Sequence, residues 1–360
     1  MSTVNLIYLG ILSDRIAILP PFAPFDHVQA SAGILHFGDV FNLPFARNKL
    51  RLSVVEWSDV KDTAASSNSS GERESLGCWS TWAASNLHER KPRQADALTS
   101  RLGFDVSYTP VPLNTRRSSE DDSYDWFLLF NPISSLIYTD VSAPREDASF
   151  PNSKGEPLPP DEHLSCFDLM YFTVAGPNDS GWESRWSPAW RFVGQYMRFT
   201  SSVVDIAKGY VRRALGVEHD TPFISVHVRH GDFQVSCEKN PNCFSPLSMY
   251  VDMVKEVQEE LYIKHGIRIS DEHVIMTSDE TNLSFWNEVD SLGWRHIDHT
   301  KENTMDLYGE WYMTLVEVVV QSLSLGFVGT GRSTLSTVSQ KRVEDWNNGT
   351  TRIVPFVPWL

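Results

Sequence analysis

The stretch Phe223–Phe233 reads FISVHVRHGDF and decides the fold of the second half of the chain. Its first half alternates apolar and β-branched residues, a pattern that predicts a buried β-strand over 223–228. The strand runs into a polar cluster in which Gly231 suits a tight turn. Ligands of open α/β sheets bind outside the carboxyl ends of the strands. We therefore expect a binding site immediately after residue 228.

The polar cluster contains His227, Arg229, His230 and Asp232. Arg229 suits an anionic ligand, because a guanidinium donates two parallel N–H bonds to a phosphate or carboxylate and a lysine cannot. A structural alternative stays open at this point, in which the charges of the turn simply pair with one another.

Length and charge restrict the class of protein. The chain has 360 residues, which predicts two domains or one large one, and its hydrophobic content of 41% is enough for a sizeable core. The formal net charge of −15 argues against a nucleic-acid surface, which must neutralise phosphates. No apolar run of about 18 residues occurs, so we expect no membrane-spanning segment in this sequence.

Strands and helices alternate after residue 217. Strict alternation predicts parallel βαβ units and a doubly wound sheet. The predicted strands are 223–228, 273–277, 295–297 and 325–328, and the predicted helices are 246–265, 283–292, 304–323 and one that begins near Ser333.

The first half of the chain is less regular. Residues 1–60 look like part of an α/β lobe, with short strands at Ile16–Leu19 and Leu52–Glu56. The polar composition of 62–75 predicts a solvated loop. A long helix, or a pair of helices, is expected to link two lobes and to end at Gly216. The expected divisions are a first lobe 1–187, a linking helix 188–216, a second lobe 217–345 and a tail 346–360.

A second constellation lies at the last strand–helix junction, where residues 326–336 read GFVGTGRSTLS. Gly329 and Gly331 allow a ligand to approach the backbone, and Ser333 and Thr334 stand where a helix would begin. The free N–H groups and the dipole of a helix N-terminus favour a phosphate there. Ordinary capping of the helix by Ser333 or Thr334 is the alternative reading.

Together the two constellations resemble the GDP-fucose protein O-fucosyltransferase family, in a divergent, fungal-type form. The element after 226 is similar to the family's His-x-Arg-x-Gly-Asp, and 327–330 and 333–336 are similar to its Phe-Ile-Gly-Thr and Ser-Thr-Phe-Ser. Glu317 stands where the family has an Asp, and Thr277–Glu280 resembles its turn after a strand. The resemblance is strong over 222–345, patchy over 1–60 and not evident over 62–185.

The resemblance implies a GT-B architecture, with two Rossmann-like lobes whose parallel sheets face a central cleft. It implies transfer of fucose from GDP-fucose to a protein or glycan hydroxyl with inversion, without a metal or any other cofactor. The implied catalytic residues are Arg229, His227 and Asp232. The implied donor-binding residues are Arg229 for the diphosphate, Ser333 and Thr334 for its oxygens, Glu317 for the guanine or ribose, and His227, Gly329 and Leu335 around them.

Two features depart from the family pattern. Leu335 replaces an aromatic ring, and the glycine-rich, Asn-containing loop that precedes the family's first helix does not occur in this sequence. No catalytic base is therefore assigned, although Asp232 and His230 are candidates. Two alternatives remain, a GDP-sugar-binding protein that no longer transfers sugar, and a histidine-type phosphatase, which the Arg229-His230-Gly231 core resembles.

The cysteines and glycosylation motifs bear on the compartment. Cys237 and Cys243 flank a short loop and either form a local disulfide or are free; the other cysteines are Cys78 and Cys166. The Asn-x-Ser/Thr motifs begin at Asn68, Asn178, Asn282 and Asn348. These motifs fit a secretory lumen if a leader precedes the sequence, and otherwise we expect a cytoplasmic protein.

Overall fold

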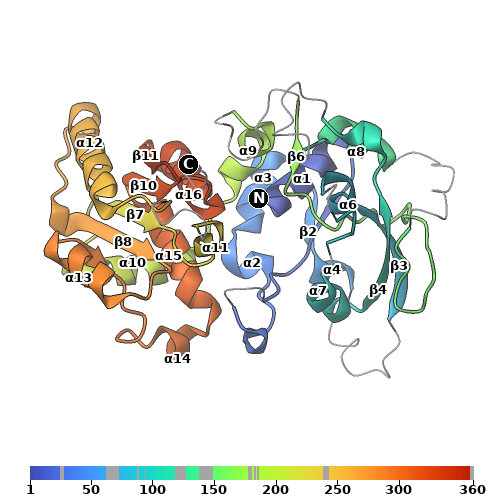
Figure 1. Ribbon diagram of the computed structural model, residues 1–360, viewed down its shortest axis with the longest axis horizontal. Helices are drawn as coiled ribbons and strands as arrows, with labels where there is room; N and C mark the ends of the chain where they lie inside the picture. The colour runs from blue at the N-terminus through green and yellow to red at the C-terminus, as the bar shows by residue number, and fades with distance from the viewer. Residues whose placement is uncertain are drawn as a thin grey trace. The chain divides into compact units, whose positions relative to one another are not determined.

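The computed structural model describes residues 1–24, 28–61, 73–86, 89–93, 95–117, 127–137, 149–176, 181, 184, 186–237 and 243–356. The chain divides into two compact units, Met1–Arg198 and Phe199–Leu360 (Figure 1). Both are mixed α/β, and every pair of named strands in them is parallel. None of the helices in the described residues has the length and apolar character to cross a membrane. Asn68 and Asn178 lie outside the described residues.

A five-stranded parallel sheet organises the second unit. Its order is β11-β10-β7-β8-β9, so the central β7 has a strand of later sequence on either side. This is the strand order 3-2-1-4-5 of the doubly wound fold, predicted above from the alternation of elements. The strands are β7 (Ile224–Val228), β8 (Val274–Ser278), β9 (Arg295–His296), β10 (Gly326–Thr330) and β11 (Thr350–Val354).

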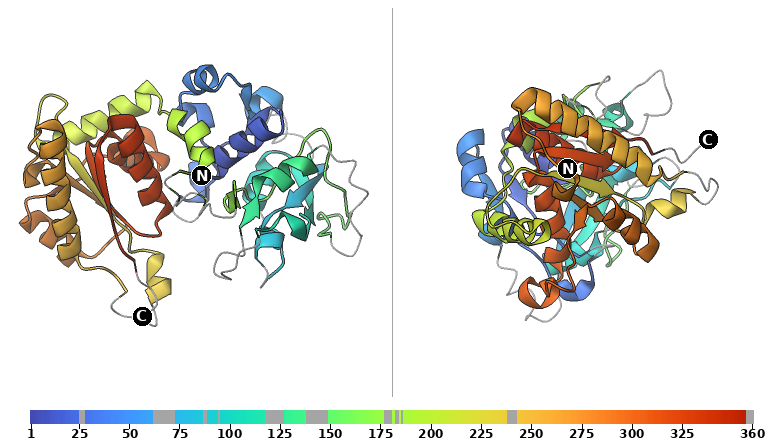
Figure 2. Two further views of the ribbon diagram at one scale, coloured as in Figure 1. Left: turned by 90° about the horizontal axis from the view of Figure 1, so that it is seen from above. Right: turned by 90° about the vertical axis from the view of Figure 1, so that its left-hand side faces the viewer.

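Helices cover both faces of this sheet (Figure 2). On one face Ile224, Val226 and Val228 of β7 belong to an apolar core, as strand alternation requires. That core includes Val254 and Val257 of α12. The helices of the unit are α10 (Ser201–Leu215), α11 (Phe233–Cys237), α12 (Leu247–His265), α13 (Leu283–Ser291), α14 (Thr304–Tyr308), α15 (Trp311–Leu323) and α16 (Thr334–Asn347).

The opposite face of the sheet meets α15 and α16, and it carries buried polar side chains beside the apolar Ile275 and Phe327. Ser225 of β7 donates to Ser324 at 2.8 Å, and Gln321 of α15 donates to Thr277 of β8 at 2.8 Å. Ser339 of α16 donates to the same Gln321 side chain at 2.7 Å. All of these side chains are buried, and each must find a partner because an unpaired buried polar group is costly. The hydrogen bonds therefore fix the position of both helices on the sheet.

Three predictions for the second unit need correction. The helix expected over 304–323 is two helices, α14 and α15, because Gly309 adopts a φ of 87° that interrupts the helix after α14. The tail expected over 346–360 contains β11, which pairs with β10 and extends the sheet. The linking segment is α9 (Pro188–Phe192), a 3₁₀ turn and α10, and the boundary between the units falls at residues 198 and 199 within it. Gly216 does end α10, in the left-handed conformation.

The described residues of the first unit form three two-stranded parallel sheets around one main core. That core includes Ile7 and Leu9 of α1, Leu19 of β1 and Ile133 of α8. The strand expected over 16–19 is β1 (Ala17–Leu19), paired with β2 (Val54–Glu56). The remaining elements are α1 (Ser2–Leu12), α2 (Phe37–Val40), α3 (Leu43–Leu50), α4 (Trp57–Val60), β3 (Glu74–Ser80), α6 (Trp82–Ser85), α7 (Asp96–Arg101), β4 (Phe104–Pro110), β5 (Leu128–Leu129), α8 (Phe130–Leu136) and β6 (Thr173–Val174).

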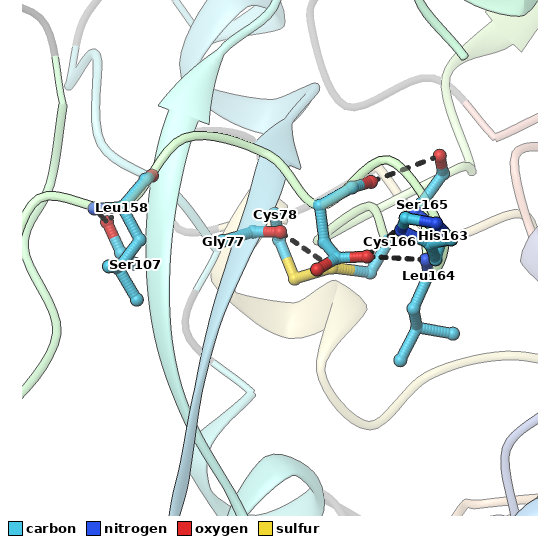
Figure 3. Close-up of a disulfide and its surroundings, with 9 residues drawn as sticks. Gly77, Cys78, Ser107, Leu158, His163, Leu164, Ser165 and Cys166 are labelled. Atoms are coloured by element: carbon cyan, nitrogen blue, oxygen red, sulfur yellow. Dashed lines mark hydrogen bonds between the residues drawn. A yellow bond between two sulfur atoms is a disulfide. The ribbon is translucent and has the colours of Figure 1, made fainter. Parts of the chain in front are cut away.

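Two disulfides stabilise the fold, one in each unit. Cys78 of β3 is bonded to Cys166, beside the backbone of Gly77 (Figure 3). A side chain at Gly77 would collide with the carbonyl of Pro159, so the backbone at Pro159 packs directly against β3. Cys237 is bonded to Cys243, which settles the choice that the sequence left open.

Removal of the two disulfides should have unequal effects. The Cys78–Cys166 bond closes a sequence separation of 88 and the Cys237–Cys243 bond one of 6. Loop-closure entropy then predicts a loss of about 4–5 kcal/mol for Cys78→Ala with Cys166→Ala, against about 2 kcal/mol for Cys237→Ala with Cys243→Ala. Calorimetric unfolding of both double variants measures the difference, and equal losses would contradict the loop-length argument.

Candidate functional site

The candidate site lies at the carboxyl edge of the five-stranded sheet, between β7 and β10. These two strands are neighbours. The strand that follows β7 in sequence, β8, lies on one side of the pair, and the strand that follows β10, β11, lies on the other. This is the topological switch point, where doubly wound folds bind their ligands. Arg229 follows the last residue of β7, and Thr330 is the last residue of β10.

The Thr330 hydroxyl joins the two strand ends. It donates to the carbonyl of His227 at 2.9 Å and accepts from the amide of Arg229 at 3.0 Å. The Tyr250 hydroxyl of α12 lies 2.7 Å away. Burial raises the pKa of Tyr250 to about 12, so this phenol stays protonated and can donate. One threonine thus fixes the backbone from which the Arg229 side chain emerges.

Ser336 joins the same strand ends to helix α16. Its hydroxyl accepts from the amide of Thr330 at 3.0 Å and lies 2.7 Å from Nδ1 of His227. His227 is only 3% exposed. The pKa of His227 is lowered to about 4, mainly by burial; Asp279 partly opposes the shift and Arg229 adds to it. His227 is therefore a neutral imidazole at physiological pH.

Arg229 carries the positive charge of the site. Its guanidinium is 2.8 Å from Asp232 and 2.6 Å from Asp279, which follows β8. The Asp232 side chain is 59% exposed, whereas that of Asp279 is 23% exposed. Solvent weakens the first pair more than the second. The alternative in which the turn's charges pair with one another is thus observed in part, with Asp279 as an additional partner.

His230 points to a different carboxylate. Its amide donates to Asp279 at 2.8 Å, and its Nδ1 lies 2.7 Å from Glu280. Burial opposes ionisation of Glu280, but hydrogen bonds from the amide of Asn282, from His230 and from the amide of Thr281 outweigh it and lower the Glu280 pKa. Asp279 and Glu280 received no role from the sequence. Their position directly after a predicted strand was the signal that could have found them.

The N-terminus of α16 shows the capping geometry. Ser333 is buried, and its hydroxyl accepts from the amide of Ser336 at 3.3 Å. The first intrahelical bond runs from Thr337 to the carbonyl of Ser333. Thr334 and Leu335 form the half-buried first turn. Gly329 has no room for a side chain, since a Cβ there would lie 2.7 Å from that of Ser336. Gly329 therefore serves the close packing of helix on strand.

Glu317 reaches the same edge of the sheet from α15. Gln321, one helical turn later, contacts Thr277, which is one residue from the end of β8. A turn of helix rises about 5.4 Å, or nearly two strand residues, and α15 leads into the amino end of β10. Glu317 consequently lies near the level of the strand ends. Its carboxylate is 3.5 Å from Nε2 of His299, a residue that the sequence did not single out.

The structure thus unites His227, Arg229, Gly329 and Ser333 through direct contacts with Thr330 and Ser336. Asp232 lies on the exposed side of Arg229, and Glu317 approaches from another helix of the same edge. This arrangement offers one guanidinium and a helix N-terminus at adjacent strand ends. Both favour the oxygens of a phosphate.

Comparison with protein families identifies the class. The family model for GDP-fucose protein O-fucosyltransferase matches residues 3–343, so the chain belongs to that family of fucosyltransferases. The match includes the region 62–185, where the sequence showed no evident resemblance. Comparison with curated protein sequences finds no significant match.

Solved structures of POFUT1 are similar to the chain as a whole. The crystal structure of POFUT1 in complex with GDP-fucose has a TM-score of 0.58 at 14% identity, covering 99% of this chain and 93% of that one. The apo form has a TM-score of 0.54 at 16% identity, with coverage of 98% and 92%. At these identities the likeness establishes the mixed α/β fold with parallel sheets.

The low pKa of His227 predicts a pH-dependent stability. The native state keeps His227 neutral down to about pH 4, whereas the unfolded chain takes up a proton near its ordinary 6.5. The stabilisation is complete above pH 6.5 and is lost between 6.5 and 4, by about 2–3 kcal/mol from pH 7 to 4.5. Urea unfolding should show that His227→Gln removes this part of the pH dependence. His219→Gln, on an exposed loop, should leave it unchanged; identical profiles for all three proteins would refute the assignment.

Proposed function

We propose that the second unit binds GDP-fucose at the β7–β10 edge and that the protein transfers the fucose to a hydroxyl of a protein acceptor. The observation that carries the proposal is the shared anchoring of Arg229 and the α16 N-terminus on Thr330. The diphosphate would lie between the Arg229 guanidinium and the first turn of α16. Membership of the O-fucosyltransferase family supports both the donor and the acceptor class.

The proposed chemistry is a displacement with inversion, in which GDP leaves as negative charge builds on its diphosphate. Arg229 and the N-terminal dipole of α16 would stabilise that charge from fixed positions. Neutral His227 would line the pocket without adding charge, and Asp232 would orient Arg229 from its exposed side. We infer a GT-B architecture for the chain, in which the first unit serves the acceptor.

The disulfides of this chain suit an oxidising compartment. Each unit contains a disulfide, and none of the four cysteines is free. Disulfides persist in secretory compartments and are rare in the cytosol. We therefore propose that the protein works in the lumen of the secretory pathway.

Loss of the Arg229 guanidinium should weaken binding of the donor nucleotide. Arg229→Ala should reduce GDP affinity about 10- to 100-fold, because a charge-assisted hydrogen bond to phosphate is lost. Titration calorimetry with GDP gives this value, and GDP-fucose with an acceptor protein gives transfer activity. GDP binding without transfer by the wild type would favour the alternative of a sugar-nucleotide-binding protein.

Arg352→Ala is the matched control. Arg352 also contacts two carboxylates, Glu256 and Glu260, each at 2.8 Å, but it lies on β11 beside α12. This substitution removes the same charge and a similar pair of ion pairs, yet GDP affinity should not change. Unchanged affinity in Arg229→Ala, or an equal loss in Arg352→Ala, would remove Arg229 from the diphosphate site.

Chelation should leave the transfer rate unchanged. We propose that protein groups supply the charge stabilisation that a divalent cation supplies in other enzymes. Among the described residues no group of three or more His, Cys, Asp or Glu side chains is arranged to hold a metal ion. Transfer measured with EDTA and with added Mn²⁺ or Mg²⁺ should be equal, and a strong dependence on either cation would contradict this mechanism.

A further inference from the structure

His299 lies behind Glu317, on the segment that follows β9. Its side chain is 13% exposed, and its Nε2 is 3.5 Å from the Glu317 carboxylate. At that position Nε2 is buried and makes no hydrogen bond. A buried ring nitrogen without a partner is uncommon, because no hydrogen bond offsets the free energy lost when the nitrogen is removed from water. Glu317 is the carboxylate within ion-pair range of that atom, and its own side chain stays 24% exposed.

The other side of the His299 ring is anchored. Nδ1 lies 3.0 Å from the hydroxyl of Thr304, which is fully buried, and that hydroxyl lies 2.6 Å from the phenol of Tyr210 on α10. The amide of Thr304 also donates to the carbonyl of His299 at 3.0 Å. The ring is therefore held by two neighbouring elements while its free nitrogen faces Glu317. A fixed second residue of this kind restricts the orientation of the group in front of it.

We propose that His299 is a positioning residue that holds the Glu317 carboxylate for recognition of the guanine base. The inference rests on the proposed function, since it requires GDP at this edge. A carboxylate with both oxygens directed at guanine accepts from the ring N–H and from the 2-amino group. A small shift of Glu317 closes the 3.5 Å gap and gives Nε2 its hydrogen bond. The network of Tyr210, Thr304 and His299 then sets base specificity without contacting the nucleotide.

The test compares GDP with IDP, which lacks only the 2-amino group. Titration calorimetry should show that the wild type prefers GDP by about tenfold, the value of one charge-assisted hydrogen bond. His299→Leu should reduce this preference to about twofold or less by weakening GDP, with little change for IDP. His299→Gln retains an N–H donor and should restore most of the preference. Glu317→Gln should match His299→Leu, and the double variant should lose nothing more.

His296→Leu is the matched control. His296 ends β9, and its Nδ1 is 3.4 Å from a different carboxylate, that of Asp290. The GDP preference should survive this substitution. Equal weakening of GDP and IDP by His299→Leu, or no rescue by His299→Gln, would mean a purely structural role and overturn the proposal. Wild-type binding of GDP without preference over IDP would overturn it while leaving the donor site intact. A wild type that does not bind GDP would overturn the proposed function as well.

Discussion

The hydrogen bonds of the Thr330 hydroxyl are the constraint on which the site depends. This one group bonds the backbones of His227 and Arg229 and meets the phenol of Tyr250. Because all of them are buried or nearly so, none has water as a substitute partner, and each bond is costly to break. The direction in which Arg229 leaves the sheet is set here, before any ligand binds. Preorganised charge of this kind does not need to be reoriented during reaction.

The buried hydrogen bonds on the α15–α16 face of the sheet extend this principle to the helices. An apolar face tolerates small slides between helix and strand, whereas hydrogen bonds specify one position. Gln321 contacts both β8 and α16, and Ser336 contacts β7 and β10. Glu317 on α15 and Ser333 on α16 are therefore held at defined places along the same edge. The α12 face is apolar, whereas the α15–α16 face combines buried apolar residues such as Val320 and Phe327 with the hydrogen bonds that set the register of the helices.

Local sequence patterns were sufficient for most of the second unit. Alternating residues gave β7, Ser333 gave the start of α16, and Gly216 gave the end of α10. They failed where neighbours in space decide. Thr350–Val354 joins the sheet only because the edge of β10 is available to it. The helix predicted over 304–323 ran through Gly309, yet the chain turns at this residue before α15 begins. In the first unit β1, β2, β5 and β6 have only two or three residues each, which leaves little periodicity for sequence reasoning to use.

The sequence by itself determined the parallel α/β class, the two constellations and their likeness to a fucosyltransferase family. Each of these can be recognised from the order of residues or elements along the chain. Only the tertiary structure decided which side chains share the site. Asp279 meets Arg229, and His299 meets Glu317, through contacts that link separate strands and helices. It also showed that Ser333 caps α16 and that Gly329 lets the helix pack closely on the strand. The physical reason is that hydrogen bonds and ion pairs depend on distance in space, and sequence spacing predicts that distance only within one element.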